Sequence, residues 1–270
     1  MKLGTVVPLE GGPDEELRKV AELGLPCCQV VCWQPDMLTE ENAEGLRQAA
    51  RERGVEVVSF WAGYSGEVVW NLVEGPKTIG IVPPEHRERR TEELQRGAEF
   101  ASRVGVSLVV THAGFIPENP TDPLYAGAVE ALRRVAERCK ELGVSFCLET
   151  GQETPVTLLR CLRDIGTDNM GVNLDPANLL MYGKANPLDA VDIIGAHIRS
   201  LHAKDGEYPT DPYQLGVEKP LGEGRADFPR LIGKLKAMGY SGPVIIEREI
   251  SGEQQIRDIL RAKDILEPLC

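Results

Sequence analysis

The sequence predicts an α/β fold in which residues 1–270 form a single (β/α)8 TIM barrel. Strand-like and helix-like segments alternate eight times along the chain, and no linker or low-complexity segment divides it. The strand-like segments are short, continuous apolar runs, which are typical of parallel strands that helices cover on both faces. Eight such units joined by right-handed crossovers close into a barrel. A doubly wound open sheet is the alternative, but no GxGxxG or Walker loop follows the first strand.

The predicted strands are rich in the β-branched and aromatic residues that suit a pleated, buried surface. In chain order they span 3–7, 27–33, 55–61, 106–112, 144–150, 170–175, 197–205 and 243–249. The two longest irregular segments, 62–84 and 206–226, follow the third and seventh strands. Loops at that end of a barrel surround the active site, so we expect these two to serve as lids or oligomer contacts.

The segments between the strands carry apolar residues at helical spacing and have recognisable start and stop signals. Thr39 is a good N-cap, and Asp122 followed by Pro123 marks another helix start. Gly24 and Gly105 end two of the helices. The predicted helices span 14–24, 39–54, 84–105, 122–143, 154–166, 186–195, 227–239 and 251–266.

The composition describes an acidic protein with enough apolar content for a large core. Of its 270 residues 42% are hydrophobic, and the formal net charge is −12. An acidic surface disfavours nucleic acids and anionic membranes, because their phosphates attract Lys and Arg clusters. No apolar run approaches the roughly 18 residues of a membrane-spanning helix, and the N-terminus lacks the apolar region of a signal peptide. The seven cysteines are scattered without a CxxC pair, which favours reduced thiols in a cytoplasmic protein.

Four residues that could bind a metal end four consecutive predicted strands. Glu149 ends VSFCLE, Asp175 ends MGVNLD, His202 ends HIRSLH and Glu247 ends PVIIE. In a barrel these strand ends meet at one mouth. Oxygen ligands with a single imidazole suit one divalent metal ion, with Mn²⁺ favoured and Mg²⁺, Co²⁺ and Zn²⁺ as further candidates. Four unrelated polar strand ends facing solvent are the alternative, but a buried, unpaired carboxylate costs several kcal/mol and so requires a cation.

His197 is the rival of His202 as the imidazole ligand. It begins its strand, whereas His202 lies near the strand end. The ligands belong at the carboxyl ends of the strands, so we expect His202 at the site and His197 at the opposite mouth.

Several motifs together resemble the sugar phosphate isomerase/epimerase superfamily, whose fold is the xylose isomerase-like TIM barrel. They are LETGQE, VNLDPANL, HIRSLHAKDG, LGEGRADF and PVIIERE, including an H-x-K-D stretch at 202–205 and a G-x-G loop at 222–224. The resemblance implies that Glu149, Asp175, His202 and Glu247 bind one divalent metal. It covers the whole chain and is densest from 144 to 250, but it does not specify a substrate, because members of the family act on many compounds.

Asn178 departs from one pattern within this superfamily. Keto-sugar 3-epimerases of the family carry a histidine three residues after the strand-6 Asp, where this chain has Asn178. A straightforward ketose 3-epimerase assignment is therefore in doubt. The branch that hydrolyses DNA at abasic sites uses three metals and several more histidines, whereas this acidic chain has only four histidines.

The residue types at the predicted site suggest proton-transfer chemistry. A divalent metal held there would act as a Lewis acid towards a carbonyl and its adjacent hydroxyl. Glu149 and Glu247, on either side of a substrate, would supply the base and the acid. Return of the proton at another carbon gives isomerisation, return on the other face gives epimerisation, and loss of a β-hydroxyl gives dehydration. The sequence leaves these three outcomes open.

Seven further residues are candidates for substrate binding because they follow strands or lie in the loops after them. They are Trp33, Trp61, His112, Glu153, Asn178, Lys204 and Arg225. Each also has a purely structural alternative: apolar packing for the two tryptophans, a core hydrogen bond for the histidine, and helix capping for Glu153 and Asn178. Lys204, on the same strand face as His202, could instead pair with a carboxylate, and Arg225 could be a solvated loop residue.

These observations predict a divalent-metal-dependent isomerase or epimerase that acts on a small sugar or related hydroxy-carbonyl compound. A metal-dependent lyase that dehydrates a polyol ketone or a shikimate-like acid is one alternative. A non-catalytic sugar-binding barrel is the other, although the four intact ligands argue against it. Whether the substrate carries a phosphate stays open, and a homo-oligomer is compatible with the fold.

Overall fold

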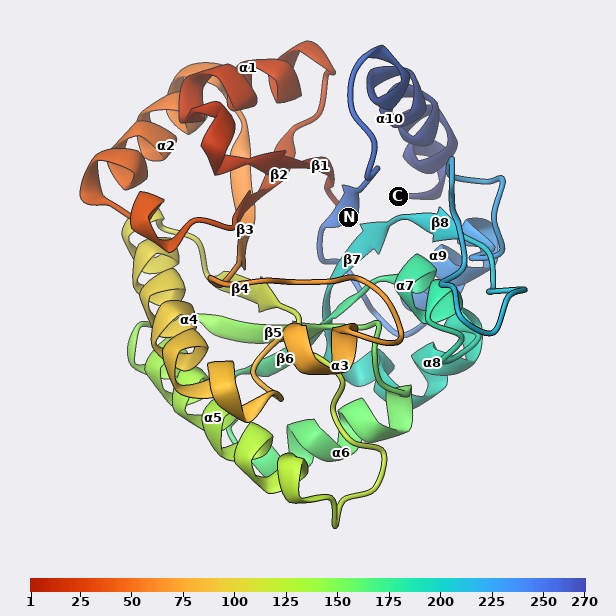
Figure 1. Ribbon diagram of the computed structural model, residues 1–270. Coiled ribbons are helices and arrows are strands. Elements are labelled where there is room, and N and C mark those ends of the chain that lie inside the picture. Colours follow the sequence, from red (N-terminus) through yellow and green to blue (C-terminus); the bar gives the residue numbers. More distant parts are fainter.

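The computed structural model describes residues 1–270, and its central feature is a closed barrel of parallel strands surrounded by helices (Figure 1). Around the barrel the strand order is β1, β10, β7, β6, β5, β4, β3 and β2, and every neighbouring pair is parallel. The strands are β1 Leu3–Pro8, β2 Cys27–Cys32, β3 Glu56–Ala62, β4 Leu108–Thr111, β5 Ser145–Glu149, β6 Met170–Leu174, β7 Ile198–Ala203 and β10 Val244–Ile246. The predicted barrel and the eight predicted strands are confirmed.

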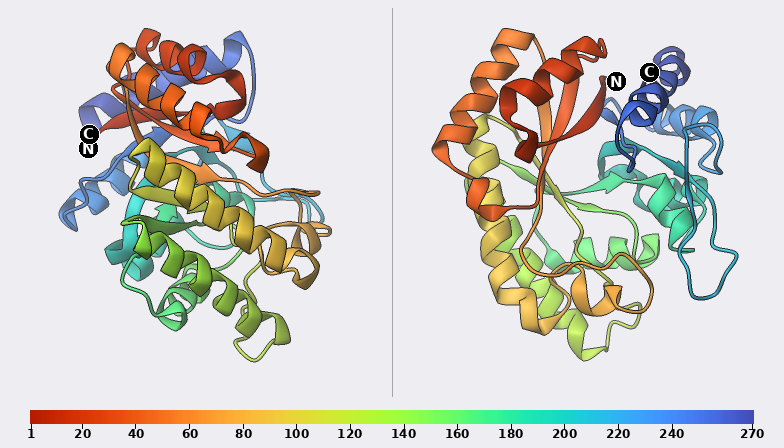
Figure 2. Two further views of the ribbon diagram at one scale, coloured as in Figure 1. Left: turned by 90° about the vertical axis from the view of Figure 1, so that its left-hand side faces the viewer. Right: turned by 45° about the horizontal axis from the view of Figure 1, so that its top comes forward.

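The eight predicted helices also form, and they make the outer ring of the barrel (Figures 1 and 2). They are α1 Pro13–Glu22, α2 Glu40–Arg53, α4 Pro84–Val104, α5 Pro123–Glu141, α6 Pro155–Ile165, α8 Pro187–Ile194, α9 Phe228–Ala237 and α10 Glu253–Leu266. Thr39 caps α2 by accepting a hydrogen bond from the amide of Asn42, as its sequence position predicts. Gly105 ends α4 with φ 89°, a left-handed conformation that glycine adopts without strain.

Four short elements were not predicted, and all of them lie in segments that follow strands. They are helix α3 (Gly75–Thr78), helix α7 (Pro176–Met181) and the antiparallel pair of β8 (Asp205–Gly206) with β9 (Glu218–Lys219). Helix α7 begins at Asp175, which accepts a hydrogen bond from the amide of Asn178. The Asp-Pro pair at this position was a helix start signal that the sequence analysis did not use. Single turns of 3-10 helix lie at Leu9–Gly11, Pro35–Met37, Gly195–His197 and Glu267–Leu269.

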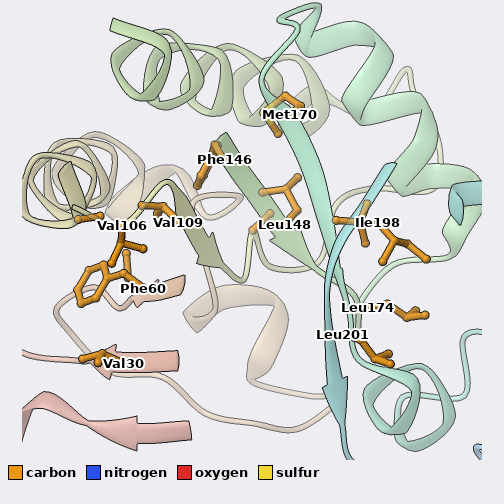
Figure 3. Packing of buried hydrophobic residues seen from close by; sticks show 14 of the residues in the cluster. Val30, Phe60, Val106, Val109, Phe146, Leu148, Met170, Leu174, Ile198 and Leu201 are labelled. Atoms are coloured by element: carbon orange, nitrogen blue, oxygen red, sulfur yellow. The ribbon is translucent and has the colours of Figure 1, made fainter. Parts of the chain in front are cut away.

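The main core lies between the strands and the helical ring (Figure 3). Phe60, Val109 and Phe146 point outward from β3, β4 and β5 into this core and are buried. Their neighbours along the strands point the other way, since side chains alternate between the two faces of a strand. Trp61 and Val110 accordingly belong to a second, small cluster. This alternation carries polar residues such as Glu149 into the barrel interior.

The segments after β3 and β7 project from the same end of the molecule (Figure 2). In Figure 1 the segment between β3 and α3 runs across the barrel mouth. These are the two long loops that the sequence analysis expected at the functional face. No helix is long and apolar enough to cross a membrane. None of the seven cysteines forms a disulfide, and six of them are buried.

Candidate active site

Four side chains from consecutive strands converge at the carboxyl-terminal mouth of the barrel. Glu149 ends β5, Asp175 follows β6, His202 lies in β7 and Glu247 follows β10. One ligand atom from each lies within 4.8 Å of those of the other three. Glu149, Asp175 and His202 are almost fully buried, whereas the side chain of Glu247 is 18% exposed. The protein thus shields Glu149, Asp175 and His202 from solvent, and the cluster is accessible to solvent at Glu247.

The polar atoms of this cluster are poorly satisfied by the protein alone. Oδ2 of Asp175, Nδ1 of His202 and Oε2 of Glu247 are buried and form no hydrogen bond of good geometry. Nδ1 of His202 lies 2.7 Å from Oε2 of Glu247 and 3.2 Å from Oε1 of Glu149, so carboxylates crowd one imidazole nitrogen. Buried polar atoms without partners are costly, and carboxylate oxygens with one imidazole nitrogen are a suitable donor set for a divalent cation. The four residues therefore fit a metal ion.

Gln29 fixes the orientation of the His202 ring. Its side-chain oxygen lies 2.8 Å from Nε2 of His202, while its amide nitrogen donates a 2.9 Å hydrogen bond to the hydroxyl of Ser59. An amide oxygen accepts hydrogen bonds, so Nε2 carries a proton and Nδ1 faces the carboxylates. Gln29 was not among the predicted site residues, although its polarity inside the apolar run CCQVVC was a usable signal.

The carboxyl groups of the cluster differ in their affinity for protons. Burial raises the pKa of Asp175 to about 7. Burial also acts to raise the pKa values of Glu149 and Glu247, but nearby basic side chains outweigh it. For Glu149 these are His112 and His202, and for Glu247 they are Lys204 and His202. The pKa values of both glutamates are therefore below the usual range. Burial lowers the pKa of His202, but the carboxylates of Glu149 and Glu247 outweigh it, so the pKa is raised. Without a metal, the cluster therefore holds two ionised glutamates against a protonated imidazole.

Lys204 is buried next to the cluster but does not line the cavity above it. Its Nζ lies 2.8 Å from Oε1 of Glu249, and 3.8 Å from oxygens of both Asp175 and Glu247. These contacts match the ion-pair alternative for Lys204 rather than direct contact with a substrate. Its positive charge offsets part of the negative charge of the carboxylates.

A cavity of about 330 Å³ lies over the cluster, and one side of it is aromatic. All three tryptophans of the chain line it, namely Trp33, Trp61 and Trp70. Trp33 lies 4.7 Å from Trp61 and 6.0 Å from Trp70 between ring centroids, and Nε1 of Trp61 donates a 2.5 Å hydrogen bond to Glu149. Trp33 and Trp61 were predicted as substrate contacts. Trp70 was not predicted, because it lies outside any strand and reaches the cavity through the loop after β3.

His112 and Asn178 also line the cavity. Nε2 of His112 lies 3.5 Å from Oε1 of Glu149, and the amide of Asn178 donates a 3.2 Å hydrogen bond to the same oxygen. Glu153 and Arg225 do not line the cavity: Glu153 is buried, and Arg225 is exposed. The structure thus brings two of these four predicted substrate contacts to the site.

Polar side chains of the segments that follow β5 and α7 also line the cavity. Gln152 and Tyr182 are 1% and 6% exposed, and both face the cavity. Gln152 directly precedes Glu153, and the path of the loop after β5 decides which of the two faces inward. Tyr182 follows α7, a helix that was not predicted.

The loop that carries Trp70 is held by a buried arginine. Arg90 of α4 donates hydrogen bonds to the carbonyls of Ser65 and Glu67 at 3.1 Å and to those of Thr78 and Gly80 at 2.7 Å. Its guanidinium also lies 4.4 Å from the ring centroid of Tyr64. Five contacts from one side chain fix both ends of this loop, so it forms a fixed wall of the site in this structure.

The loop after β7 is held by Asp205, which ends the H-x-K-D stretch. Its carboxylate accepts hydrogen bonds from the amides of Gly206, Gly222, Gly224 and Ala226 at 2.8 to 3.1 Å. A Cβ at Gly224 would lie 2.2 Å from Oδ1 of Asp205, so this position requires glycine. The aspartate of the H-x-K-D motif thus binds the backbone amides of the G-x-G motif, and this interaction holds the two ends of the loop together.

The closed barrel and the acidic cluster at its mouth define an α/β-barrel protein with a candidate divalent-metal site. The chain belongs to the xylose isomerase-like TIM barrel family, whose model matches residues 17–266. The resemblance to the sugar phosphate isomerase/epimerase superfamily is thereby confirmed.

The chain is similar to three further proteins in sequence or in structure. A xylose isomerase domain protein from Planctomyces limnophilus is 32% identical, with a TM-score of 0.93 over 99% of this chain and 96% of that chain. An uncharacterized protein of Methanocaldococcus jannaschii is 26% identical over 281 residues, covering 98% of this chain and 88% of that protein. A D-tagatose 3-epimerase-like protein is 23% identical, with a TM-score of 0.78 over 100% of this chain and 97% of that chain, a likeness of fold.

Proposed function

We propose that the protein is a divalent-metal-dependent isomerase or epimerase that acts on a small sugar or related hydroxy-carbonyl compound. The observation that carries the proposal is the cluster of Glu149, Asp175, His202 and Glu247 at the floor of a small cavity. A sugar epimerase-like protein among the structural neighbours supports the same class of reaction. Mn²⁺ is the favoured metal because oxygen ligands predominate, and Mg²⁺, Co²⁺ and Zn²⁺ suit the same donors less specifically.

Glu149, Asp175, His202 and Glu247 are the proposed ligands. A divalent cation bound there would polarise a carbonyl and so acidify the adjacent C–H. His202 is oriented for this task by Gln29, which directs Nδ1 at the carboxylates. Partners of this kind matter for affinity because they hold the ligand ring in one orientation.

Glu149 and Glu247 are the proposed acid–base pair. Both line the cavity above the cluster, where each carboxylate can reach a bound substrate and exchange a proton with it. Trp61 and Asn178 donate hydrogen bonds to different oxygens of Glu149 and hold that carboxylate in place. Glu247 lies on the more open side of the cluster. One glutamate would take the α-proton, and the same or the other would return it to the substrate.

Solvent isotope exchange tests this proposal even though the product is unidentified. The Mn²⁺-loaded protein is incubated in D₂O with a panel of ketoses and polyol ketones, and the products are followed by NMR and mass spectrometry. We expect deuterium at a carbon next to the carbonyl and a product of unchanged composition apart from the isotope. Loss of water from the product would instead assign the metal-dependent lyase. Absence of exchange with every compound while metal is bound would favour the non-catalytic sugar-binding barrel.

A further inference from the structure

The wall of the cavity beside Glu149 carries polar atoms that the protein does not satisfy. Both side-chain atoms of Gln152, the hydroxyl of Tyr182 and Nδ1 of His112 are buried and have no hydrogen-bond partner. All three residues line the cavity. The Gln152 side chain lies next to the Tyr182 hydroxyl and interacts with it, but neither group forms a hydrogen bond of good geometry. Each unsatisfied polar atom costs roughly 1–3 kcal/mol when buried, so four of them on one wall indicate a ligand.

These three residues form one continuous patch. A Cβ built at Gly151 would lie 3.5 Å from the His112 ring, 3.4 Å from Asn178 and 3.8 Å from the Tyr182 ring. Gln152 is the next residue along the chain. The patch is therefore centred on the turn that follows β5, directly next to the proposed base Glu149. It offers donors and acceptors of hydrogen bonds but no formal charge.

Apart from the proposed metal site, the side chains that line the cavity offer no permanent positive charge. The lining includes the carboxylates of Glu149, Glu247 and Glu249 but no lysine or arginine. Lys204 is nearby but is 2.8 Å from Glu249 and does not line the cavity, and Arg225 is exposed outside it. A phosphate or carboxylate group on the substrate would therefore meet three carboxylates without a cationic side chain, and recognition of such groups in proteins depends on Arg or Lys.

We propose that Gln152, Tyr182 and His112 form a hydroxyl-binding subsite, and that the substrate is an uncharged polyhydroxy ketone or aldehyde without phosphate or carboxylate. This inference rests on the proposed function and narrows its substrate class. The volume of about 330 Å³ lies at the small end of ligand pockets, which measure roughly 300–1,000 Å³, so the substrate is of monosaccharide size. The tryptophans supply the apolar surface on which the C–H face of such a compound packs.

Binding is measured by tryptophan fluorescence of the Mn²⁺-loaded protein, since all three tryptophans line the cavity. The probes are neutral ketohexoses and the matching ketohexose 6-phosphates, with metal content determined on the same samples. We expect at least one neutral ketohexose to bind, and its phosphate to bind at least about tenfold more weakly because of the uncompensated charge. Tighter binding of the phosphates, or no binding of any neutral compound, would overturn the inference. The metal content shows separately whether the metal site of the proposed function is intact.

Two variants test the subsite itself. Gln152→Leu and Tyr182→Phe should each weaken binding of the neutral ketose by about 5- to 100-fold, the usual consequence of removing a hydrogen-bonding partner. Neither change should lower the melting temperature of the ligand-free protein, because each removes polar atoms that are unsatisfied there. The matched controls are Gln48→Leu and Tyr213→Phe, at exposed positions that do not line the cavity. For a deoxyketose that lacks the bound hydroxyl, the variants should bind as the wild type does; an equal loss for both ketoses would assign a merely structural role.

Discussion

The two sides of the cavity are built in different ways. The charged side consists of Glu149, Asp175, His202 and Glu247, which are fixed by the ends of parallel strands. The aromatic side consists of Trp33 and Trp61, which lie at strand ends, and of Trp70, which lies in a loop whose backbone Arg90 holds by hydrogen bonds. The charged side thus depends on the strands of the barrel, whereas the aromatic side also depends on a loop that buried side chains hold in place. Substitutions on the charged side should therefore affect the reaction rate and metal binding. Substitutions on the aromatic side should affect the stability of the protein and the binding of the substrate.

The largest effect is expected on the charged side, from Glu247→Gln. Loss of the proposed acid–base group should lower kcat by at least about 1,000-fold, within the range usual for general acid–base catalysis. The measurement is the rate of solvent deuterium incorporation into a ketose that the wild type exchanges. Glu253→Gln, at a side chain that is 90% exposed, is the control and should retain the wild-type rate. A near-normal rate of deuterium exchange in Glu247→Gln would show that Glu247 is not the acid–base group.

On the aromatic side the largest effect is expected from Arg90→Met. The variant removes four hydrogen bonds to backbone carbonyls, of which only that of Ser65 keeps another charged donor, Arg89, and it should lower the free energy of unfolding by about 3 kcal/mol. Urea unfolding measures this change, and the emission of Trp70 should shift to the red as the loop opens. Arg89→Met is a neighbouring control at a side chain that is 53% exposed, where we expect less than about 1 kcal/mol. Equal effects of the two substitutions would contradict the role assigned to Arg90.

A smaller effect is expected from Gln29, which orients His202 on the charged side of the cavity. Gln29→Leu removes the acceptor that orients His202, and it should weaken Mn²⁺ binding by about 10- to 100-fold without abolishing it. Metal titration monitored by electron paramagnetic resonance gives the affinity. Gln48→Leu serves again as the control. Unchanged affinity in Gln29→Leu would show that the barrel alone orients the imidazole.

The last effect is on the pH dependence of stability and concerns Glu153, whose burial raises its pKa to about 8 from an ordinary value of 4.5. Between these values the folded state retains a proton that the unfolded state has released, so stability should fall as the pH rises from 4.5 to 8, by up to about 1.4 kcal/mol per pH unit. Glu153→Gln should flatten this dependence and raise stability at pH 8. Unfolding curves at pH 5 and pH 8 measure it, with the exposed Glu137→Gln as the control. An unchanged slope in Glu153→Gln would show that the carboxyl is ionised in the folded protein.

The same difference between the two sides explains what the sequence could predict. Strand ends of a parallel barrel coincide in space, so Glu149 and Glu247 could be placed together from the apolar runs that precede them. Trp70 and Tyr182 could not, because each depends on the path of a loop or on an unpredicted helix. Gln152 and Glu153 show the limit most clearly: only the conformation of the turn decides that the first faces the cavity and the second does not.

The metal content of the purified protein tests the central claim most directly. Elemental mass spectrometry is applied to the wild type and to the double variant Glu149→Gln/Glu247→Gln after loading with Mn²⁺ and removal of excess metal. The account predicts about one divalent metal ion per wild-type chain and its loss in the double variant, since both carboxylates are proposed ligands. Absence of bound metal from the loaded wild type, or an undiminished metal content in the double variant, would contradict it.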